Sequence, residues 1–156
     1  MTATATTTAE KHELVVTRTL DAPRALVFRA WTQPEHLARW LGRGNFKAGA
    51  YHVDFRVGGS FRASIFGMEG GEHKFFGTYR EIVEPERLVF TFAWDGKGPE
   101  LAKENLITLT FVDAGDKTKM TLRQAYFATA ATRDDHGKGW NQCIDRLVEY
   151  LAGGTH

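Results

Sequence analysis

Hydrophobic and polar residues alternate with a period of two from Ala50 onward for about 75 residues. Such alternation is typical of strands with one buried face. Turn signals interrupt it at the spacing of successive hairpins. They lie at Gly58-Gly59, Gly70-Gly71, Glu84 to Arg87, Asp95 to Pro99 and Asp113 to Asp116. The pattern therefore predicts an antiparallel meander of six strands.

The segments before the meander predict one strand and two short helices. Residues 13–20 (ELVVTRTL) are rich in strand-forming residues and stop at Asp21-Ala22-Pro23, where Asp can cap a helix and Pro suits its first turn. A second helix start appears at Thr32-Gln33-Pro34-Glu35. We expect a bent pair of helices between the first strand and the meander.

The longest helix is predicted at the end of the chain. Thr132-Arg133-Asp134-Asp135 combines a capping residue with acidic first-turn residues, and Gly153-Gly154 provides a stop signal. One apolar stripe recurs at helical spacing and comprises Trp140, Cys143, Ile144, Leu147 and Leu151. This helix is the element able to cover the sheet.

The order strand, two helices, six strands, helix predicts an α+β fold in which a curved antiparallel sheet wraps around the C-terminal helix. We expect a single domain over residues 13–152, a disordered leader over 1–12 and a tail over 153–156. Inward alternation is predicted for Leu88, Phe90, Phe92 and Trp94, and for Met120, Leu122, Gln124 and Tyr126. Because a bent sheet cannot follow a straight helix along its whole length, a gap should open near one end. The candidate ligand contacts are Phe61, Trp94, Gln124, His136, Trp140 and Ile144.

Charge and cysteine content narrow the function classes. Twenty Lys and Arg balance nineteen Asp and Glu, giving a net charge of +1, which provides no field to gather nucleic acid. The chain has one cysteine and no run of about 20 apolar residues. We therefore expect a cytoplasmic protein with no membrane span and no nucleic-acid partner, a monomer or a weak homodimer.

Several segments resemble the homologues of the heat-shock-protein-90 ATPase activator. These are Pro23, Val27-Phe28, Ala30-Trp31, Pro34-Glu35, Leu37, Trp40, Asp54 to Gly59, Gly77 to Ile82, Pro85 to Phe90, Thr118 to Gln124 and His136 to Trp140. The resemblance implies a START-like helix-grip fold within the SRPBCC superfamily of polyketide cyclases, lipid carriers and hormone receptors. It also implies a cavity between helix and sheet. In the eukaryotic activators a separate N-terminal domain makes a major contact with the chaperone, and in its place we expect only a short polar leader here.

Our leading hypothesis is a non-enzymatic domain, without a cofactor, that binds a small apolar or amphipathic molecule of lipid or polyketide type. Trp140 and His136 are either ligand contacts or core and cap residues. One alternative is a cyclase- or hydrolase-type enzyme with His136, Glu81 or Asp54 as acid or base. Another is a co-chaperone-like interaction module, which would present an exposed patch.

Asp54 and Arg56 are either polar anchors in the cavity or a solvated surface pair. His52, Asp54 and His73, or Asp134-Asp135-His136, place metal donors close in sequence. Neither set has a known ligand spacing, so we predict no metal site. Cys143 is expected to be a buried hydrophobe, and the absence of a GxSxG sequence leaves no predicted nucleophile or catalytic residue.

Overall fold

A computed structural model describes residues 13–41, 47–66, 72–94, 104–127 and 129–152. Several predictions fall outside these ranges: the leader over 1–12, the tail over 153–156, the Gly153-Gly154 stop signal, the Gly70-Gly71 turn and the loop from Asp95 to Pro99.

The described elements follow the predicted order. The strands are β1 (Leu14–Leu20), β2 (Lys47–Val53), β3 (Ser60–Phe66), β4 (Glu72–Val83), β5 (Arg87–Trp94), β6 (Asn105–Ala114) and β7 (Lys117–Ala125). The helices are α2 (Arg24–Thr32), α3 (Pro34–Trp40) and α5 (Ala130–Ala152). The α+β helix-grip prediction is confirmed.

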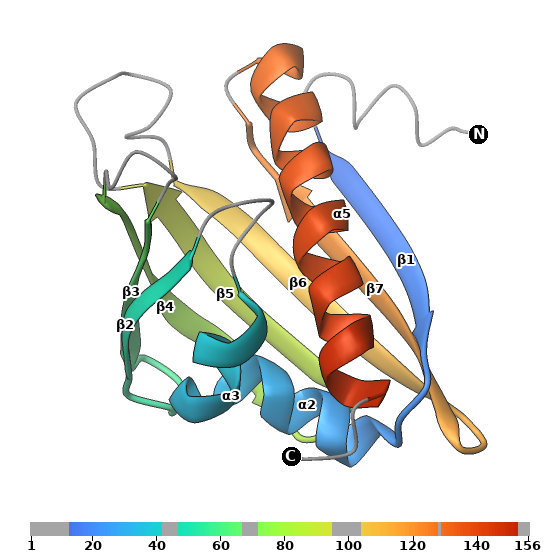
Figure 1. Cartoon of the computed structure of the whole chain (residues 1–156). Helices are drawn as coiled ribbons and strands as arrows, with labels where there is room; N and C mark the ends of the chain where they lie inside the picture. The colour runs from blue at the N-terminus through green and yellow to red at the C-terminus, as the bar shows by residue number, and fades with distance from the viewer. Residues whose placement is uncertain (1–12, 42–46, 67–71, 95–103, 128, 153–156) are drawn as a thin grey trace.

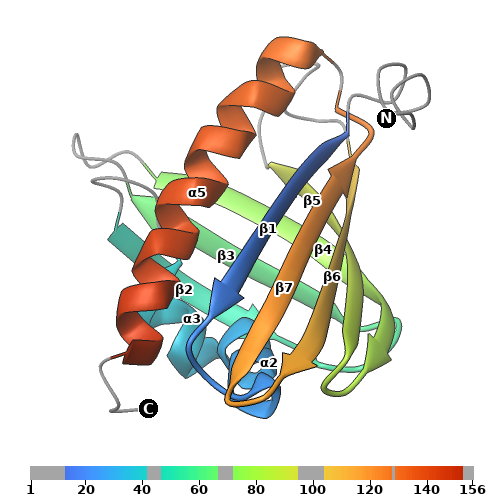
Figure 2. The ribbon, with the colours of Figure 1, turned by 90° about the vertical axis from the view of Figure 1, so that its right-hand side faces the viewer.

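The seven strands form one antiparallel sheet in the order β1-β7-β6-β5-β4-β3-β2. The first strand therefore pairs with the last, and the other strands follow the chain as a meander. Figure 1 shows α5 lying across the sheet while α2 and α3 sit at one end of it. Figure 2 shows how strongly the sheet bends, because β1 and β7 cross the direction of β3 and β4. None of the helices in the described ranges is long and apolar enough to cross a membrane.

Local irregularities help the sheet to bend. The register shifts between Tyr79 and Glu81 on β4, and again between Ala48 and Tyr51 on β2. Such bulges increase the twist and re-aim side chains. Gly77 allows a close approach at the same place, since a Cβ there would overlap the Thr91 carbonyl oxygen and come within 2.7 Å of the Phe61 ring.

The core lies between the sheet and α5. The predicted stripe of α5 is buried throughout, and so are the inward residues of β5 and β7, with Trp94 half-buried. Tyr126 is the exception and that prediction was wrong. β7 ends at Ala125, and Tyr126 has a φ of 75° and is 43% exposed. Alternation does not continue once the strand geometry ends.

Two of the predicted helix starts require correction. α2 begins at Arg24 with Pro23 at the N-cap, so Asp21 does not cap it. α5 begins at Ala130, two residues before the predicted cap Thr132. The Thr129 hydroxyl oxygen accepts the Thr132 backbone N–H at 3.1 Å, which is the contact of an N-cap residue with N3. Thr132 to Asp135 therefore lie inside the helix. The start of α3 at Pro34 is as predicted.

Candidate ligand-binding site

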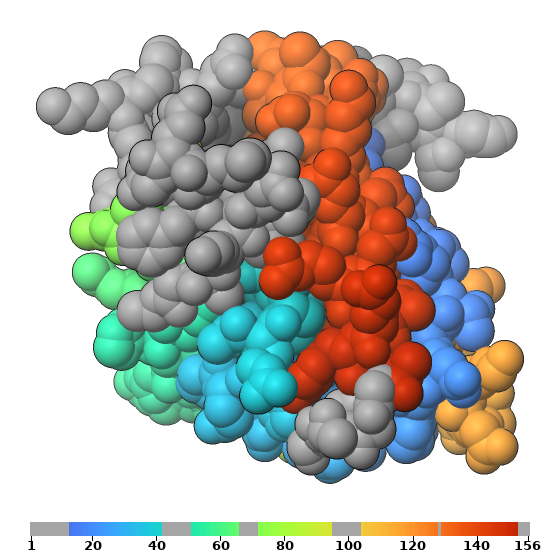
Figure 3. Space-filling view, in the orientation of Figure 1, coloured from blue at the N-terminus to red at the C-terminus, as the bar shows by residue number. Residues whose placement is uncertain are grey.

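A cavity made of two adjoining compartments lies between α5, α3 and the inner face of the sheet. The cavity volume is about 40 Å³ in the first compartment and about 50 Å³ in the second, and both compartments are partly open to solvent. Both compartments are lined by Leu41, Phe75, Phe92 and Trp140, so they lie next to each other. Figure 3 shows α3 packed beside the lower half of α5 at this face.

The first compartment, which we call the Tyr79 compartment, has aromatic walls. Its further lining residues are Trp31, Leu37, Tyr51, Val53, Phe61, Arg62, Ala63, Tyr79 and Phe90. The rings meet mainly edge to face, as in Phe61 against Phe90 with centroids 5.4 Å apart and planes at 87°. Edge-to-face contact is a favoured geometry for aromatic pairs. The walls are therefore apolar and packed through their rings, which suits an apolar ligand.

The two tyrosines of this compartment keep their protons. Burial raises the pKa of Tyr51 well above its ordinary value, with a smaller contribution from Cys143, and burial also raises the pKa of Tyr79. The Tyr51 hydroxyl donates a hydrogen bond of 2.9 Å to the Leu41 carbonyl oxygen. Both side chains are thus neutral phenols at physiological pH.

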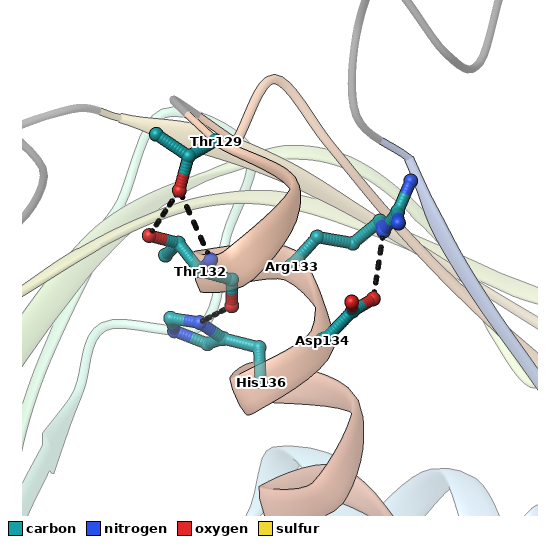
Figure 4. A network of polar contacts seen from close by, with 5 residues as sticks. All are labelled: Thr129, Thr132, Arg133, Asp134 and His136. Atoms are coloured by element: carbon teal, nitrogen blue, oxygen red, sulfur yellow. Dashed lines mark hydrogen bonds and ion pairs between the residues drawn. The ribbon is translucent and has the colours of Figure 1, made fainter.

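The second compartment, which we call the His136 compartment, is completed by Ile65, Trp94, His136, Gly139 and Cys143. The Trp94 indole N–H donates to His136 Nε2 at 2.8 Å, and His136 Nδ1 lies 3.1 Å from the Thr132 carbonyl oxygen. Because Nε2 accepts and the carbonyl needs a donor, the pair of bonds selects the neutral ring with its proton on Nδ1. Figure 4 shows this contact in the first turns of α5.

Trp140 belongs to both compartments and is also held by the core. Its indole N–H donates to Gln124 Oε1 at 2.7 Å. The Gln124 amide donates in turn to Asn105 Oδ1 at 3.1 Å, and the Asn105 amide donates to the Tyr126 carbonyl oxygen at 3.1 Å. This chain satisfies polar groups that would be costly to bury alone. Trp140 is packed in the core and also lines both compartments, and its contact with a ligand stays a prediction.

Four of the six candidate contacts line the cavity: Phe61, Trp94, His136 and Trp140. Gln124 and Ile144 do not line either compartment and are fully buried in the core. The amide of Gln124 is engaged by two neighbours, and Ile144 lies deeper on the helix stripe. Contact between the four lining residues and a ligand stays a prediction.

The polar candidates from the sequence lie elsewhere. β2 ends at Val53, and Asp54 pairs with Arg56 at 3.0 Å while their side chains are 53% and 68% exposed. The two residues therefore form a solvated surface pair, and neither of them lines a compartment. Glu81 forms an exposed ion pair with Arg87 at 3.0 Å, also outside the cavity.

The possible metal donors, for which the sequence predicted no site, are not brought together. His52 and His73 are exposed, and Asp134 pairs with Arg133 at 3.1 Å on the outside of α5 (Figure 4). Within the described ranges, no group of three His, Cys, Asp or Glu side chains is placed to hold an ion. Cys143 is buried, as expected, and lines the His136 compartment.

Sequence reasoning missed several lining residues, above all Tyr79 and Phe75 on β4 and Trp31 on α2. A signal for the first two was available, because Phe75, Gly77 and Tyr79 alternate onto one side of their strand. Trp31 carries no comparable signal. Its position depends on packing against Trp40 and Trp140, whose ring centroids lie 4.7 and 5.7 Å away.

A bent antiparallel sheet that grips a long C-terminal helix, with an aromatic cavity between them, defines a START-like helix-grip protein. The family model for Activator of Hsp90 ATPase homolog 1-like proteins matches residues 21–152. The chain belongs to this family. No curated protein matches the sequence.

Solved structures agree with this assignment. A protein from Chromobacterium violaceum is 27% identical with a TM-score of 0.78, and the alignment covers 89% of this chain and 96% of that one. An uncharacterised protein from Rhizobium leguminosarum is 30% identical with a TM-score of 0.72, covering 90% and 93%. An AHSA1 protein from Silicibacter pomeroyi shares the fold at 18% identity, with a TM-score of 0.79 and coverage of 90% and 97%.

Proposed function

We propose that this protein is a non-enzymatic binding domain that holds a small apolar or amphipathic molecule, of lipid or polyketide type, in the cavity between α5 and the sheet. The observation that carries the proposal is the apolar, largely aromatic lining of the two compartments. Ligand sites in proteins are usually concave and apolar, with few polar groups.

The state of the ionisable side chains supports binding over catalysis. Both ring nitrogens of His136 are engaged in hydrogen bonds, and the Tyr51 hydroxyl is engaged by Leu41. Glu81 and Asp54, the other acid–base candidates, are in surface ion pairs. A cyclase- or hydrolase-type activity would need one of these groups to reach a substrate.

Native mass spectrometry of freshly purified protein tests the proposal, followed by a thermal-shift screen of fatty acids, flavonoids and polyketides. We expect a bound mass or a ligand-dependent rise in melting temperature. The matched pair of variants is Ala63→Phe, which adds a ring inside the Tyr79 compartment, and Val112→Phe, which adds the same kind of bulk at a position that is 55% exposed.

Ala63→Phe should remove the ligand-dependent shift, while Val112→Phe should retain it. A screen in which no compound raises the melting temperature and nothing co-purifies would overturn the proposal. So would equal binding by both variants, because the ligand would then lie outside the cavity.

The family description suggests a second candidate, contact with the Hsp90 chaperone. If this candidate is correct, the immobilised protein retains the chaperone. The Ala63→Phe variant should retain it equally well. Absence of retention would count against the chaperone role and leave the ligand proposal unaffected.

A further inference from the structure

Tyr79 carries a buried hydroxyl group with no hydrogen-bond partner among the described residues. The residue is 4% exposed and lies on the inward side of β4. Its backbone N–H and carbonyl bond to Gly59 and Gly58, but its side chain contacts rings, namely Phe55, Phe61 and Phe90. A buried hydroxyl without a partner is costly, and native structures usually supply one.

Other polar groups at the cavity are already bonded within the protein. Tyr51 donates to Leu41, Trp31 donates its indole N–H to Met120 Sδ at 3.2 Å, and Trp140 donates to Gln124. These contacts hold the walls in place. Tyr79 lines the same compartment as Tyr51, but its hydroxyl bonds to none of the described residues.

We propose that the Tyr79 hydroxyl is the polar anchor of the cavity and bonds a neutral oxygen of the bound molecule. This inference rests on the proposed function and names the chemistry of the ligand. Asp54 and Arg56, which the sequence offered as anchors, lie on the surface, whereas Tyr79 lies among the lining rings.

The walls also indicate the shape and charge of the ligand. Aromatic walls that meet edge to face accept another flat ring in the same geometry. Arg62 is the cationic residue of the Tyr79 compartment, but it alternates with inward Phe61 and Ala63 and is exposed beside its register partners His52 and Phe76. Its charge therefore faces away from the cavity. The ligand class is a flat aromatic molecule with an uncharged hydroxyl or carbonyl group.

Two probes of nearly the same size separate the hydrogen bond from the apolar contact. 2-Naphthol carries a hydroxyl where 2-methylnaphthalene carries a methyl group. Tyr79→Phe should weaken binding of 2-naphthol by about threefold to tenfold, the value of one hydrogen bond, and change binding of 2-methylnaphthalene by less than about twofold. Calorimetric titration of the full chain gives both dissociation constants.

Tyr126→Phe is the matched control, because it removes a phenol hydroxyl from a side chain outside both compartments. It should leave both constants unchanged. Tyr79→Phe should not lower the melting temperature, because it removes a buried hydroxyl that makes no hydrogen bond to a described residue, so a binding loss cannot be attributed to unfolding.

The outcomes distinguish the two proposals. If both probes bind but Tyr79→Phe changes them by the same factor, the anchor is wrong and cavity binding stands. If neither probe binds the unaltered protein, the proposal that the cavity takes flat aromatic molecules fails. The broader screen of fatty acids and polyketides then decides separately whether the cavity binds any ligand.

Discussion

Tyr51 and Tyr79 face the same compartment and respond to it in the same way. Burial raises the pKa of both side chains. A tyrosine whose pKa is higher in the folded than in the unfolded protein stabilises the fold fully below the unfolded value, which is ordinarily 10.0. Above that pH the unfolded chain loses protons that the folded protein retains, so this stability is lost as the pH rises.

We predict that the free energy of unfolding decreases as the pH rises from about 9.5 to about 11.5. In the Tyr51→Phe/Tyr79→Phe double variant it should decrease less steeply. Each tyrosine can contribute at most about 1.4 kcal/mol per pH unit. Urea unfolding at a series of pH values measures the two slopes. Parallel slopes would show that the two phenols titrate alike in the folded and unfolded chains.

Gln124 offers a second test at the scale of single residues. Replacing it by Met keeps much of its volume but leaves the Trp140 indole N–H and an Asn105 amide oxygen without their partner. We expect a loss of about 2 to 4 kcal/mol in the free energy of unfolding, because each unsatisfied buried group costs about 1 to 3 kcal/mol.

The comparison variant is Asp54→Ala, which breaks the exposed ion pair with Arg56. It should change the free energy of unfolding by less than about 0.5 kcal/mol. Denaturant titrations of the two variants rank the residues. A larger loss of unfolding free energy for Asp54→Ala than for the Gln124 variant would contradict the assignment of Gln124 to the core and of Asp54 to the surface.

At the scale of elements, the start of α5 matters because the first turns of this helix present His136 to the cavity. Thr129 caps the helix, and Thr132 lies three residues inside it (Figure 4). Thr129→Ala should lower the free energy of unfolding by about 1 kcal/mol and speed amide exchange in the first turn. Thr132→Ala should cost less, since its backbone N–H still has the Thr129 oxygen. Hydrogen exchange followed residue by residue distinguishes the two, and the opposite order would restore the cap that the sequence suggested.

The order of the strands and the buried side of the last helix could be predicted because the periodicity of apolar residues determines both. Alternation and turn residues predicted six strands in order, and the helix stripe predicted which side of α5 is buried. The errors lie at ends, where periodicity stops carrying information. Tyr126 follows the last residue of β7, and Thr129 and Thr132 offer two caps three residues apart.

The site was less predictable than the fold because its contacts join distant parts of the chain. Trp94 and His136 are 42 positions apart, and the Trp31 indole meets Met120 across 89 positions. The cavity positions of Phe61, Trp94, His136 and Trp140 could be predicted because the order and the inward faces of their elements were predicted correctly. Gln124 could not be separated from them by alternation, since its partners are fixed only when α5 meets β7 and β6.

At the scale of the whole molecule, the bend of the sheet and the straightness of α5 leave a cavity that α3 helps to enclose. Family membership and similar solved structures support the architecture. The use of the cavity depends on its lining, because one fold can serve many functions. The proposed function therefore requires that a small apolar molecule enters the space beside Phe75, Phe92 and Trp140.

Intermolecular nuclear Overhauser effects between isotope-labelled protein and 2-methylnaphthalene test this claim most directly. We predict contacts from the probe to the three aromatic side chains shared by the compartments, Phe75, Phe92 and Trp140. Contacts confined to exposed apolar side chains such as Val57, Phe76 and Val112 would contradict the account, because the probe would then bind the surface and leave the cavity empty.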